Sequence, residues 1–434
     1  MLSSFKEWLR YERHWSQALL LPLLVLVNFY YRMQSDVKHV GFLSKVFRLS
    51  WPGTYGLVTS EVKKRYLDNK GKLKNNAYDA FVNDAEVLDR YKQFSENPAS
   101  MLDGIITVVA PRSEASKGII TIAYSYYFTI FLKYFDYLKL EQDYYVVLEP
   151  SWNGLCDESI LAFARFSSPV FVMAYEERDY AFIASLNSNL IPLKLSANWW
   201  ISPDQFTAGK PQAQRDIDVI MVAAWAQFKR HDRFFKAINE LKKRGRELTV
   251  TLVGYPNDMQ LSDILALATE HDIEKQISFY EWISPEEVAS LLGRAKVNII
   301  WSRFEGLNRA IIEGMFCDTP CILREGFNFG MRYPYINSQT GCYSKENALP
   351  DTILEVIDNP SQFSPRDYVL KHHNCYKAAE LLGSAISEVD SRIHADSVVP
   401  KLSGLNGMEY LNEDDQDKFK PDYQKLQSFC VKGK

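Results

Sequence analysis

Residues 301–321 read W-S-R-F-E-G-L-N-R-A-I-I-E-G-M-F-C-D-T-P-C. The apolar run just before, 297–301, predicts a buried strand, and the residues after Leu307 have the apolar spacing of a helix. A helix that begins at the carboxyl end of a strand offers free N–H groups and a partial positive charge, which suit an anion. Glu305 lies in the crossover and Glu313 in the helix, so two carboxylates that can accept hydrogen bonds from hydroxyl groups flank this position.

The same alternation of apolar runs and helical segments begins near residue 104 and predicts two α/β units with parallel sheets. In the first unit we expect strands at 105–110, 144–148, 170–174 and 190–195, and helices at 119–140, 157–166 and 179–187. In the second we expect strands at 219–224, 248–253, 277–280, 297–301 and 320–323, and helices at 230–243, 261–270, 285–295 and 308–317. The short loops of the second unit favour a Rossmann-like domain with its ligand at the carboxyl edge of the sheet.

Five segments follow from this pattern. The polar stretch 198–215, with two prolines, is the expected interdomain linker. Before it lie a possible membrane-associating segment, 1–40, and an N-terminal α/β domain, 41–197. After it lie a second, Rossmann-like domain, 216–364, and a segment of C-terminal helices with a polar tail, 365–434.

Composition narrows the class of protein. With 434 residues, 47% of them hydrophobic, the chain can bury two cores. The net charge of −4 gives no general basic footprint, so we expect no nucleic acid partner. Six scattered cysteines and seven scattered histidines indicate neither a zinc site nor a disulfide framework. We therefore expect a cytoplasmic protein with reduced cysteines.

Residues 15–31, W-S-Q-A-L-L-L-P-L-L-V-L-V-N-F-Y-Y, form an apolar run edged by aromatic residues. The run is at the lower limit of the length that spans a bilayer. No small-residue cleavage site follows, so we do not expect a removed signal peptide. Two interpretations stay open: attachment to the cytoplasmic face of a membrane, and a helix buried under the N-terminal domain.

The spacing of Glu305 and Glu313, preceded by S-P-E-E-V-A-S-L-L-G-R-A-K-V at 284–297, resembles the E-G-x-x-x-x-x-x-E region of retaining, family-4-type glycosyltransferases (glycosyl transferases group 1). The resemblance covers 190–345 well and 104–190 weakly. It implies a GT-B fold, in which two Rossmann-like domains face each other across a cleft, with 41–197 as the acceptor-side domain and 216–364 as the nucleotide-sugar-binding domain. It also implies that Glu305 contacts the donor sugar and Glu313 the ribose.

The segment 222–231, V-A-A-W-A-Q-F-K-R-H, places Lys229 and Arg230 at a predicted helix start. Two cations oppose the helix dipole there, which indicates an anionic ligand. The resembling enzymes read V-G-R-x-x-x-x-K-G-H, with the Arg and Lys both gripping the diphosphate; here Ala224 replaces that Arg and Arg230 the Gly. The resemblance implies Lys229, Glu305 and Arg230 as catalytic residues, with no metal and no cofactor besides the nucleoside diphosphate sugar. The triplet at 216–218 precedes its strand, at the wrong edge for a metal site.

Further residues are expected around these. The resemblance and the predicted strand ends give as donor-binding candidates Gly254, Trp282, Ser302, Gly306, Leu307, Asn308 and Glu313. The loop 110–118 links a predicted strand to a predicted helix, and it resembles the glycine-containing loop beneath the donor. The next strand ends in E-P-S-W-N-G, also at the carboxyl edge of the sheet. The acceptor-side candidates are Arg112, Glu114, Lys117, Gly118, Glu149 and Trp152.

The expected activity is transfer of a sugar from a nucleoside diphosphate sugar to a hydroxyl of a saccharide or lipid-linked acceptor, with retention, in glycan, polysaccharide or glycolipid synthesis. In the mechanism proposed for such folds, the leaving phosphate itself accepts the proton. Two alternatives stay open, a nucleotide-sugar epimerase and a catalytically silent GT-B binding subunit. Ala224 favours the silent subunit, whereas the presence of both Glu305 and Glu313 favours transfer.

Overall fold

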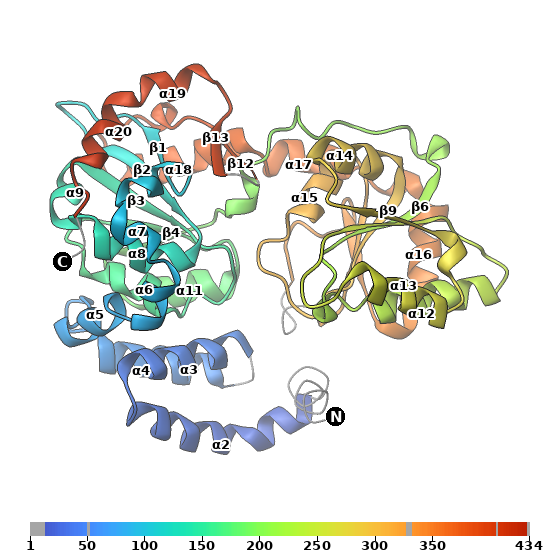
Figure 1. Ribbon diagram of the computed structural model, residues 1–434, viewed down its shortest axis with the longest axis horizontal. Helices are drawn as coiled ribbons and strands as arrows, with labels where there is room; N and C mark the ends of the chain where they lie inside the picture. The colour runs from blue at the N-terminus through green and yellow to red at the C-terminus, as the bar shows by residue number, and fades with distance from the viewer. Residues whose placement is uncertain (1–13, 50–52, 327–331, 405–406, 432–434) are drawn as a thin grey trace. The chain divides into compact units, whose positions relative to one another are not determined.

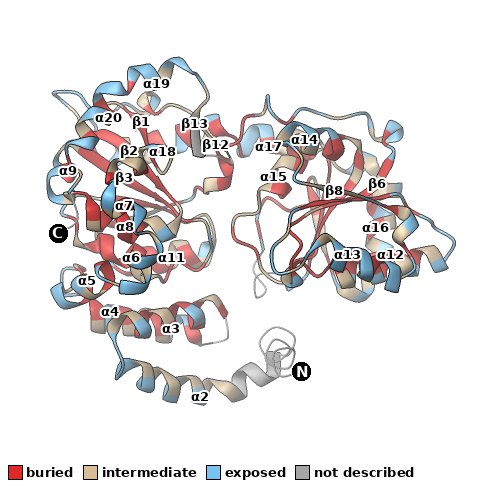
Figure 2. Ribbon diagram, viewed as in Figure 1, coloured by how far each residue is buried: buried red, intermediate tan, exposed pale blue. Residues whose placement is uncertain are grey.

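The computed structural model describes residues 14–49, 53–326, 332–404 and 407–431 (Figure 1). The chain divides into two compact units, Ile201–Asn374 and a unit made of Met1–Trp200 with Cys375–Lys434. Each unit holds a sheet whose strands are mainly parallel, and Figure 2 shows most residues of these strands as buried. The prediction of two α/β units with parallel sheets is therefore confirmed.

The unit Ile201–Asn374 is built on a six-stranded parallel sheet in the order β11-β10-β9-β6-β7-β8. Its strands are β6 Ile217–Val222, β7 Val250–Gly254, β8 Ile277–Glu281, β9 Ala295–Ile300, β10 Cys321–Arg324 and β11 Gly341–Ser344. The chain winds outward from β6 to β8, returns to the other side of β6, and winds outward again from β9 to β11. The reversal lies between β6 and β9, and open α/β sheets bind their ligands at the carboxyl ends of the strands that flank such a switch point.

The helices α12 His231–Lys243, α13 Leu261–Glu270, α14 Pro285–Arg294 and α15 Arg309–Phe316 lie close to where the sequence predicts them and connect successive strands. Helices α16 Leu349–Asp358, which was not predicted, and α17 Pro365–His372 follow β11. Helix α14 begins with a capping box formed by Ser284 and Glu287 and has Pro285 in its first turn. Helix α12 buries Phe234, Ile238 and Leu241 on one face.

The other unit has a five-stranded sheet whose strands follow chain order from one edge to the other, so its winding does not reverse. Its strands are β1 Ile106–Ala110, β2 Gly118–Ala123, β3 Tyr144–Glu149, β4 Val170–Met173 and β5 Leu190–Leu193. Strands β2 to β5 are parallel, and β1 pairs with β2 in antiparallel fashion.

The predicted helix at 119–140 is wrong. Its first residues form β2, and shorter helices follow: η2 Ser125–Tyr127, α8 Phe128–Tyr134 and α9 Tyr137–Asp143. The reason is local, because Ile119, Ile120 and Ile122 are β-branched and buried between β1 and β3, an environment that favours a strand. The loop before them is consequently the turn of a hairpin and not a strand-to-helix crossover.

Helices at both ends of the chain complete this unit. Before the sheet lie α2 His14–Arg32, α3 Asp36–Leu49, α4 Thr54–Tyr66, α5 Asn75–Val82, α6 Ala85–Arg90, α7 Gln93–Glu96 and η1 Pro98–Leu102. Within the sheet region lie α10 Glu158–Leu161, η3 Ala162–Arg165, α11 Glu177–Ser185 and η4 Ala197–Trp199. The C-terminal part returns as α18 Cys375–Val389, β12 Lys401–Gly404, β13 Gly407–Tyr410, α19 Asp414–Lys418 and α20 Lys420–Gln427. Leu382 and Ile386 of α18 pack with Tyr145 and Phe171 of the sheet.

Candidate active site

The loops that follow β6 and β9 are joined by three consecutive contacts. The Arg303 N–H donates to the Phe228 carbonyl at 2.8 Å. The Phe228 and Phe304 rings stack with their centroids 4.8 Å apart. Lys229 Nζ donates to Glu305 Oε1 at 2.5 Å. The two loops therefore lie side by side at the switch point of the sheet.

The Lys229–Glu305 ion pair is the centre of this arrangement, and its side chains are 10% and 8% exposed. The Ser302 hydroxyl donates to the same Glu305 oxygen at 2.5 Å. Taking both charges out of water is costly, and the pair is stable only because these contacts compensate each charge. The structure thus brings together Lys229, Glu305 and Ser302, as the sequence predicts.

Helix α15 begins directly after this loop. Asn308 caps it, its side chain accepting from the Ile311 N–H at 3.3 Å. The Gly306 carbonyl accepts from the Tyr333 hydroxyl at 3.0 Å, which fixes the backbone ahead of the cap. The N–H groups that follow Glu305, from Leu307 onward, precede or open the first turn, where a helix presents its positive end. This is a position for an anionic group.

Glu313 lies one turn into α15, with its side chain 13% exposed. Arg309 Nε donates to Glu313 Oε1 at 3.0 Å. This i, i+4 pair orients the carboxylate along the helix. Glu313 is thus held on the same helix whose N-terminus follows Glu305.

Arg230 is buried and begins α12 in the left-handed conformation, with φ of +60°. That conformation suits glycine, which explains why the resembling enzymes carry a Gly at this position. Arg230 Nη2 donates to Glu346 Oε2 at 2.6 Å, and Arg233 also contacts the Glu346 carboxylate. Two carboxylates, Glu305 and Glu346, therefore compensate the two cations at this helix start.

Arg324, the last residue of β10, is a buried cation that sequence reasoning missed. Its Nε donates to the Ser302 carbonyl at 3.2 Å, and its Nη2 donates to the Arg303 carbonyl at 3.4 Å. It therefore holds the backbone of the loop that carries Glu305. The only sequence signal is a cation that closes the apolar run of β10.

Gly254 ends β7, where the backbone approaches its neighbour closely. A Cβ atom there would lie 2.4 Å from the Ala223 carbonyl oxygen and 2.8 Å from the Trp225 ring. The glycine is thus required by packing within the unit. The Trp282 N–H donates to the Gly254 carbonyl, and the exposed Trp282 ring lies 5.2 Å from that of Tyr255. These rings form an open aromatic surface at the carboxyl ends of β7 and β8.

In the other unit, Glu149 ends β3 and is fully buried. Its carboxylate accepts from Lys401 Nζ at 2.9 Å and from Trp200 Nε1 at 3.0 Å. Trp152 follows in the next loop and is exposed. Of these two candidates, only Trp152 has a side chain open to a ligand.

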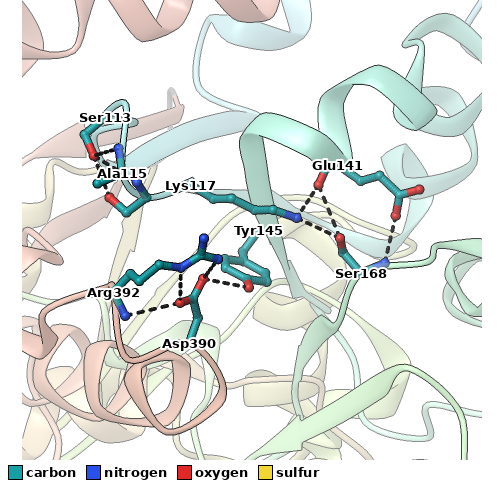
Figure 3. A network of polar contacts seen from close by, with 9 residues as sticks. Ser113, Ala115, Lys117, Glu141, Tyr145, Ser168, Asp390 and Arg392 are labelled. Carbon is teal, nitrogen blue, oxygen red and sulfur yellow. Dashed lines mark hydrogen bonds and ion pairs between the residues drawn. The ribbon is translucent and has the colours of Figure 1, made fainter.

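The hairpin candidates lie elsewhere. Because Gly118 begins β2, the turn that holds Arg112, Glu114 and Lys117 lies at the amino ends of the parallel strands, opposite to Glu149. Figure 3 shows Lys117 reaching the Glu141 carbonyl, at 2.6 Å, and the Ser168 hydroxyl, at 2.8 Å. These partners precede β3 and β4.

Arg112 contacts Asp143 and Asp422, and Glu114 is exposed with no hydrogen bond or ion pair in the part of the chain that the structure describes. The expectation that this loop faces the same edge as Glu149 is therefore wrong, because it rested on the helix at 119–140.

Asp216 and Asp218 lie at the amino end of β6 and are paired with Arg294 and Lys296. Within residues 14–49, 53–326, 332–404 and 407–431, no group of three or more His, Cys, Asp or Glu side chains is arranged to hold a metal ion.

The family model described as Glycosyl transferases group 1 matches residues 204–380. No curated protein sequence matches the chain.

Among solved structures, sucrose-phosphate synthase from Thermosynechococcus elongatus is similar, with a TM-score of 0.47 and 16% identity over 63% of this chain and 74% of that chain. HepE from Anabaena, solved with UDP and glucose, has a TM-score of 0.45 and 11% identity over 56% of this chain and 72% of that chain. The lipopolysaccharide outer core galactosyltransferase WaaB has a TM-score of 0.44 and 13% identity over 70% of this chain and 79% of that chain. On the match to the family model, residues 204–380 belong to the glycosyl transferases group 1 family.

Proposed function

We propose that this chain is a retaining glycosyltransferase that transfers a sugar from a nucleoside diphosphate sugar to a hydroxyl group. The observation that carries the proposal is the Lys229–Glu305 ion pair, 2.5 Å long, at the switch point between β6 and β9. This is the place where an open α/β sheet binds a nucleotide. A cation, a carboxylate and a helix N-terminus meet there, and a nucleoside diphosphate sugar offers a partner for each.

The donor diphosphate binds at the N-terminus of α15 and against Lys229. Lys229 exchanges the Glu305 carboxylate for a phosphate oxygen, and Glu305 then accepts hydrogen bonds from the donor sugar hydroxyls. Ser302 keeps Glu305 in place during this exchange, since its hydroxyl already contacts the carboxylate. Glu313, one turn into the helix, accepts from the ribose hydroxyls.

In the transfer step, the bond between the anomeric carbon and the diphosphate oxygen breaks. A bond to the acceptor oxygen forms on the same face of the sugar, and the acceptor proton passes to the departing phosphate oxygen. No protein nucleophile is required. Lys229, Arg230 and the α15 dipole stabilise the charge that develops on the diphosphate, as fixed cations and helix N-termini do in other enzymes. We propose on this ground that the reaction needs no metal ion.

For the acceptor, we propose a saccharide or a lipid-linked saccharide bound by the unit that contains Trp152. The exposed indole ring of Trp152 follows β3 and offers a flat apolar surface to a sugar ring. Glu149 has no part in this proposal, because Lys401 and Trp200 already occupy its carboxylate.

A screen of UDP, GDP and ADP and their sugars tests the proposal, with thermal stabilisation and donor hydrolysis as the two readouts. We expect one base to stabilise the protein and one of its sugars to be hydrolysed slowly without an acceptor. Lys229→Ala should slow hydrolysis by about 30- to 1,000-fold. Lys236→Ala, which removes an exposed lysine of the adjacent helix α12, should leave it unchanged.

Three other outcomes would contradict parts of the proposal. Nucleotide binding without hydrolysis or transfer from any donor would identify a silent binding subunit, and interconversion of the sugar without transfer would identify an epimerase. Loss of activity in EDTA that magnesium or manganese restores would overturn the metal-independent mechanism.

A further inference from the structure

Helix α2 is fixed to its unit by one face. Leu24, Val27 and Tyr31 pack against the core of the unit, and the Tyr31 ring stacks on Phe42 with centroids 4.9 Å apart. Asn28 Oδ1, on the same face, accepts a hydrogen bond from His39 Nε2 at 2.9 Å. One side of the apolar run is therefore docked, as the buried-helix interpretation predicts.

The opposite face of α2 is also apolar and is exposed. Leu26 and Met33 are 69% and 73% exposed, and Figure 2 shows the described part of α2 in the colours of intermediate and exposed residues. The large apolar side chains exposed on this face are Leu23, Val25, Leu26, Phe29, Tyr30 and Met33. No charged residue lies between His14 and Arg32. A helix that is apolar all round requires an apolar environment on both sides, and the part of the fold that the structure describes supplies one on a single side.

The segment that begins at the last residue of α2 is basic. Residues 32–65 hold seven Lys and Arg residues and two acidic ones, a net charge of +5 in a chain whose net charge is −4. Both acidic residues are in ion pairs, Asp36 with Arg65 and Glu61 with Arg32. Arg65 Nη2 also donates to the Arg32 carbonyl, so the end of α4 lies beside the end of α2.

Three exposed lysines complete this end of the unit: Lys38 in the first turn of α3, and Lys63 and Lys64 in the last turn of α4. An apolar face bordered by cations is complementary to a surface with an apolar interior and anionic groups at its boundary.

We propose that the outer face of α2, with Lys38, Lys63 and Lys64, docks on an anionic lipid bilayer, with the helix lying in the plane of the interface. Apolar side chains such as Leu26 and Phe29 enter the acyl region, and the lysines contact anionic headgroups. No helix among the described residues is long and apolar enough to cross a membrane, and an interfacial position requires neither property. A second copy of the chain is less well suited to cover this face of α2, because an isologous contact would bring two sets of the same cations together.

Cosedimentation of the full chain with vesicles tests this proposal, with phosphatidylcholine alone or mixed with phosphatidylglycerol and with no nucleotide present. We expect binding to the mixed vesicles and weak binding to phosphatidylcholine alone. The double variant Leu26→Glu/Phe29→Glu should bind the mixed vesicles about ten-fold more weakly or worse, since two apolar side chains no longer enter the lipid. Both side chains are exposed, so the thermal midpoint should stay unchanged. Lys63→Glu/Lys64→Glu should remove the preference for the anionic lipid.

The matched control is Leu138→Glu, which places the same charge at an exposed leucine of α9 in the same unit. This variant should bind vesicles as the unchanged chain does. Absence of vesicle binding by the unchanged chain, equal loss in the Leu138→Glu control, or a dimer in solution that Leu26→Glu/Phe29→Glu dissociates would each overturn the proposal. Nucleotide binding by the same variants is a separate readout, so a failure here is distinguishable from a failure of the proposed transferase activity.

Discussion

Each unit contains a buried Lys–Glu ion pair whose carboxylate lies at or just beyond the carboxyl end of a parallel strand, but the two pairs have different surroundings. In one unit Lys401 and Glu149 are both 0% exposed and 2.9 Å apart. Lys401 Nζ also donates to the Thr121 hydroxyl at 2.7 Å and lies 5.3 Å from the centre of the Trp200 ring, while Trp200 donates to Glu149. In the other unit, the Lys229–Glu305 pair keeps some exposure and lies beside the start of a helix.

The difference teaches that the ion pair itself does not mark a functional site. Permanent protein partners surround Lys401, and its position in β12 lets the pair fasten the returning C-terminal segment to β3. Burial lowers the pKa of Lys401, and the attraction of Glu149 opposes that shift. Under the proposed function, Lys229 instead exchanges its carboxylate partner for the phosphate of the donor, and the N-terminus of α15, which follows Glu305 directly, receives the same phosphate.

The largest effect on stability should come from breaking the fully buried Lys401–Glu149 pair. Lys401→Met removes the cation and leaves Glu149 buried without a counter-charge, which should lower the free energy of unfolding by about 3–5 kcal/mol in urea denaturation. Adding Glu149→Gln should restore a substantial part of that loss, since no charge then remains buried. A loss below about 1 kcal/mol for Lys401→Met alone would show that water reaches the pair. The Lys401–Glu149 pair would then not differ from the Lys229–Glu305 pair in its role in stability.

Breaking the Lys229–Glu305 pair should instead lower activity more than stability. Lys229→Ala should cost about 2–4 kcal/mol of transition-state stabilisation, measured as kcat/KM for the donor, because the developing diphosphate charge loses a fixed cation. The urea midpoint of Lys229→Ala should move less than that of Lys401→Met. Glu305 lies beyond the carboxyl end of β9, keeps some exposure to solvent and retains its hydrogen bond from Ser302. Unchanged kcat/KM, or a stability loss as large as that of Lys401→Met, would place Lys229 in the same structural role as Lys401.

Much of the unit Ile201–Asn374 could be predicted because its helices and strands are short and clearly bounded. Helix α13 begins and ends where the sequence predicts it, at Leu261 and Glu270. Glu305 and Lys229 could be assigned to one edge because each follows a strand of the same parallel sheet. Glu346 could not be placed, because the strand before it, β11, was not predicted. Arg324 could not be assigned, because its partners in the loop that carries Glu305 are backbone carbonyls, which every residue carries.

In the other unit, the apolar run at 119–123 fits a buried strand as well as a buried helix. Only its pairing with β1 and β3 decides between them. With a helix at this position, the loop with Arg112 and Lys117 would lie at the carboxyl ends of the strands; with the strand β2, it lies at their amino ends.

His231, the first residue of α12, follows Lys229 and Arg230 and should make the stability of the protein depend on pH. Burial, with a smaller contribution from Lys229, lowers the pKa of His231 to about 3 from its ordinary 6.5. Between these values the unfolded chain binds a proton that the folded chain does not, so His231 makes stability fall as pH decreases from 6.5 towards 3. At pH 5 this term should amount to about 2 kcal/mol.

His231→Phe removes that proton while retaining an aromatic ring beside Trp225. The loss of stability between pH 7 and pH 5 should therefore be smaller in the variant, by roughly the 2 kcal/mol that His231 contributes. Parallel stability curves for the two proteins would mean that His231 is accessible to solvent in the folded state.

Glu313→Gln should have a smaller effect on donor use than Lys229→Ala. The amide keeps the shape and one acceptor oxygen but loses the charge, so the hydrogen bonds to the ribose should weaken by about 1–2 kcal/mol. The change should appear mainly in KM for the donor, with kcat nearly kept, because the ribose is remote from the reacting bond. A fall in kcat with unchanged KM would instead assign Glu313 to the transition state.

The smallest effect should come from Asp216, at the amino end of β6. Its carboxylate binds Arg294 in bidentate fashion, at 3.0 and 2.6 Å, which lowers the pKa of Asp216 to about 2. The side chains of Arg294 and Asp216 are 37% and 51% exposed, and ion pairs at the surface contribute about 0–1 kcal/mol. Asp216→Ala should therefore change the urea midpoint slightly and leave kcat/KM for the donor unaltered, with or without added magnesium. Since Asp216 and the Lys229–Glu305 pair lie beyond opposite ends of β6, a variant of Asp216 that lost donor use would show that the two edges of this sheet are not independent, and the assignment of the chemistry to the switch point alone would fail.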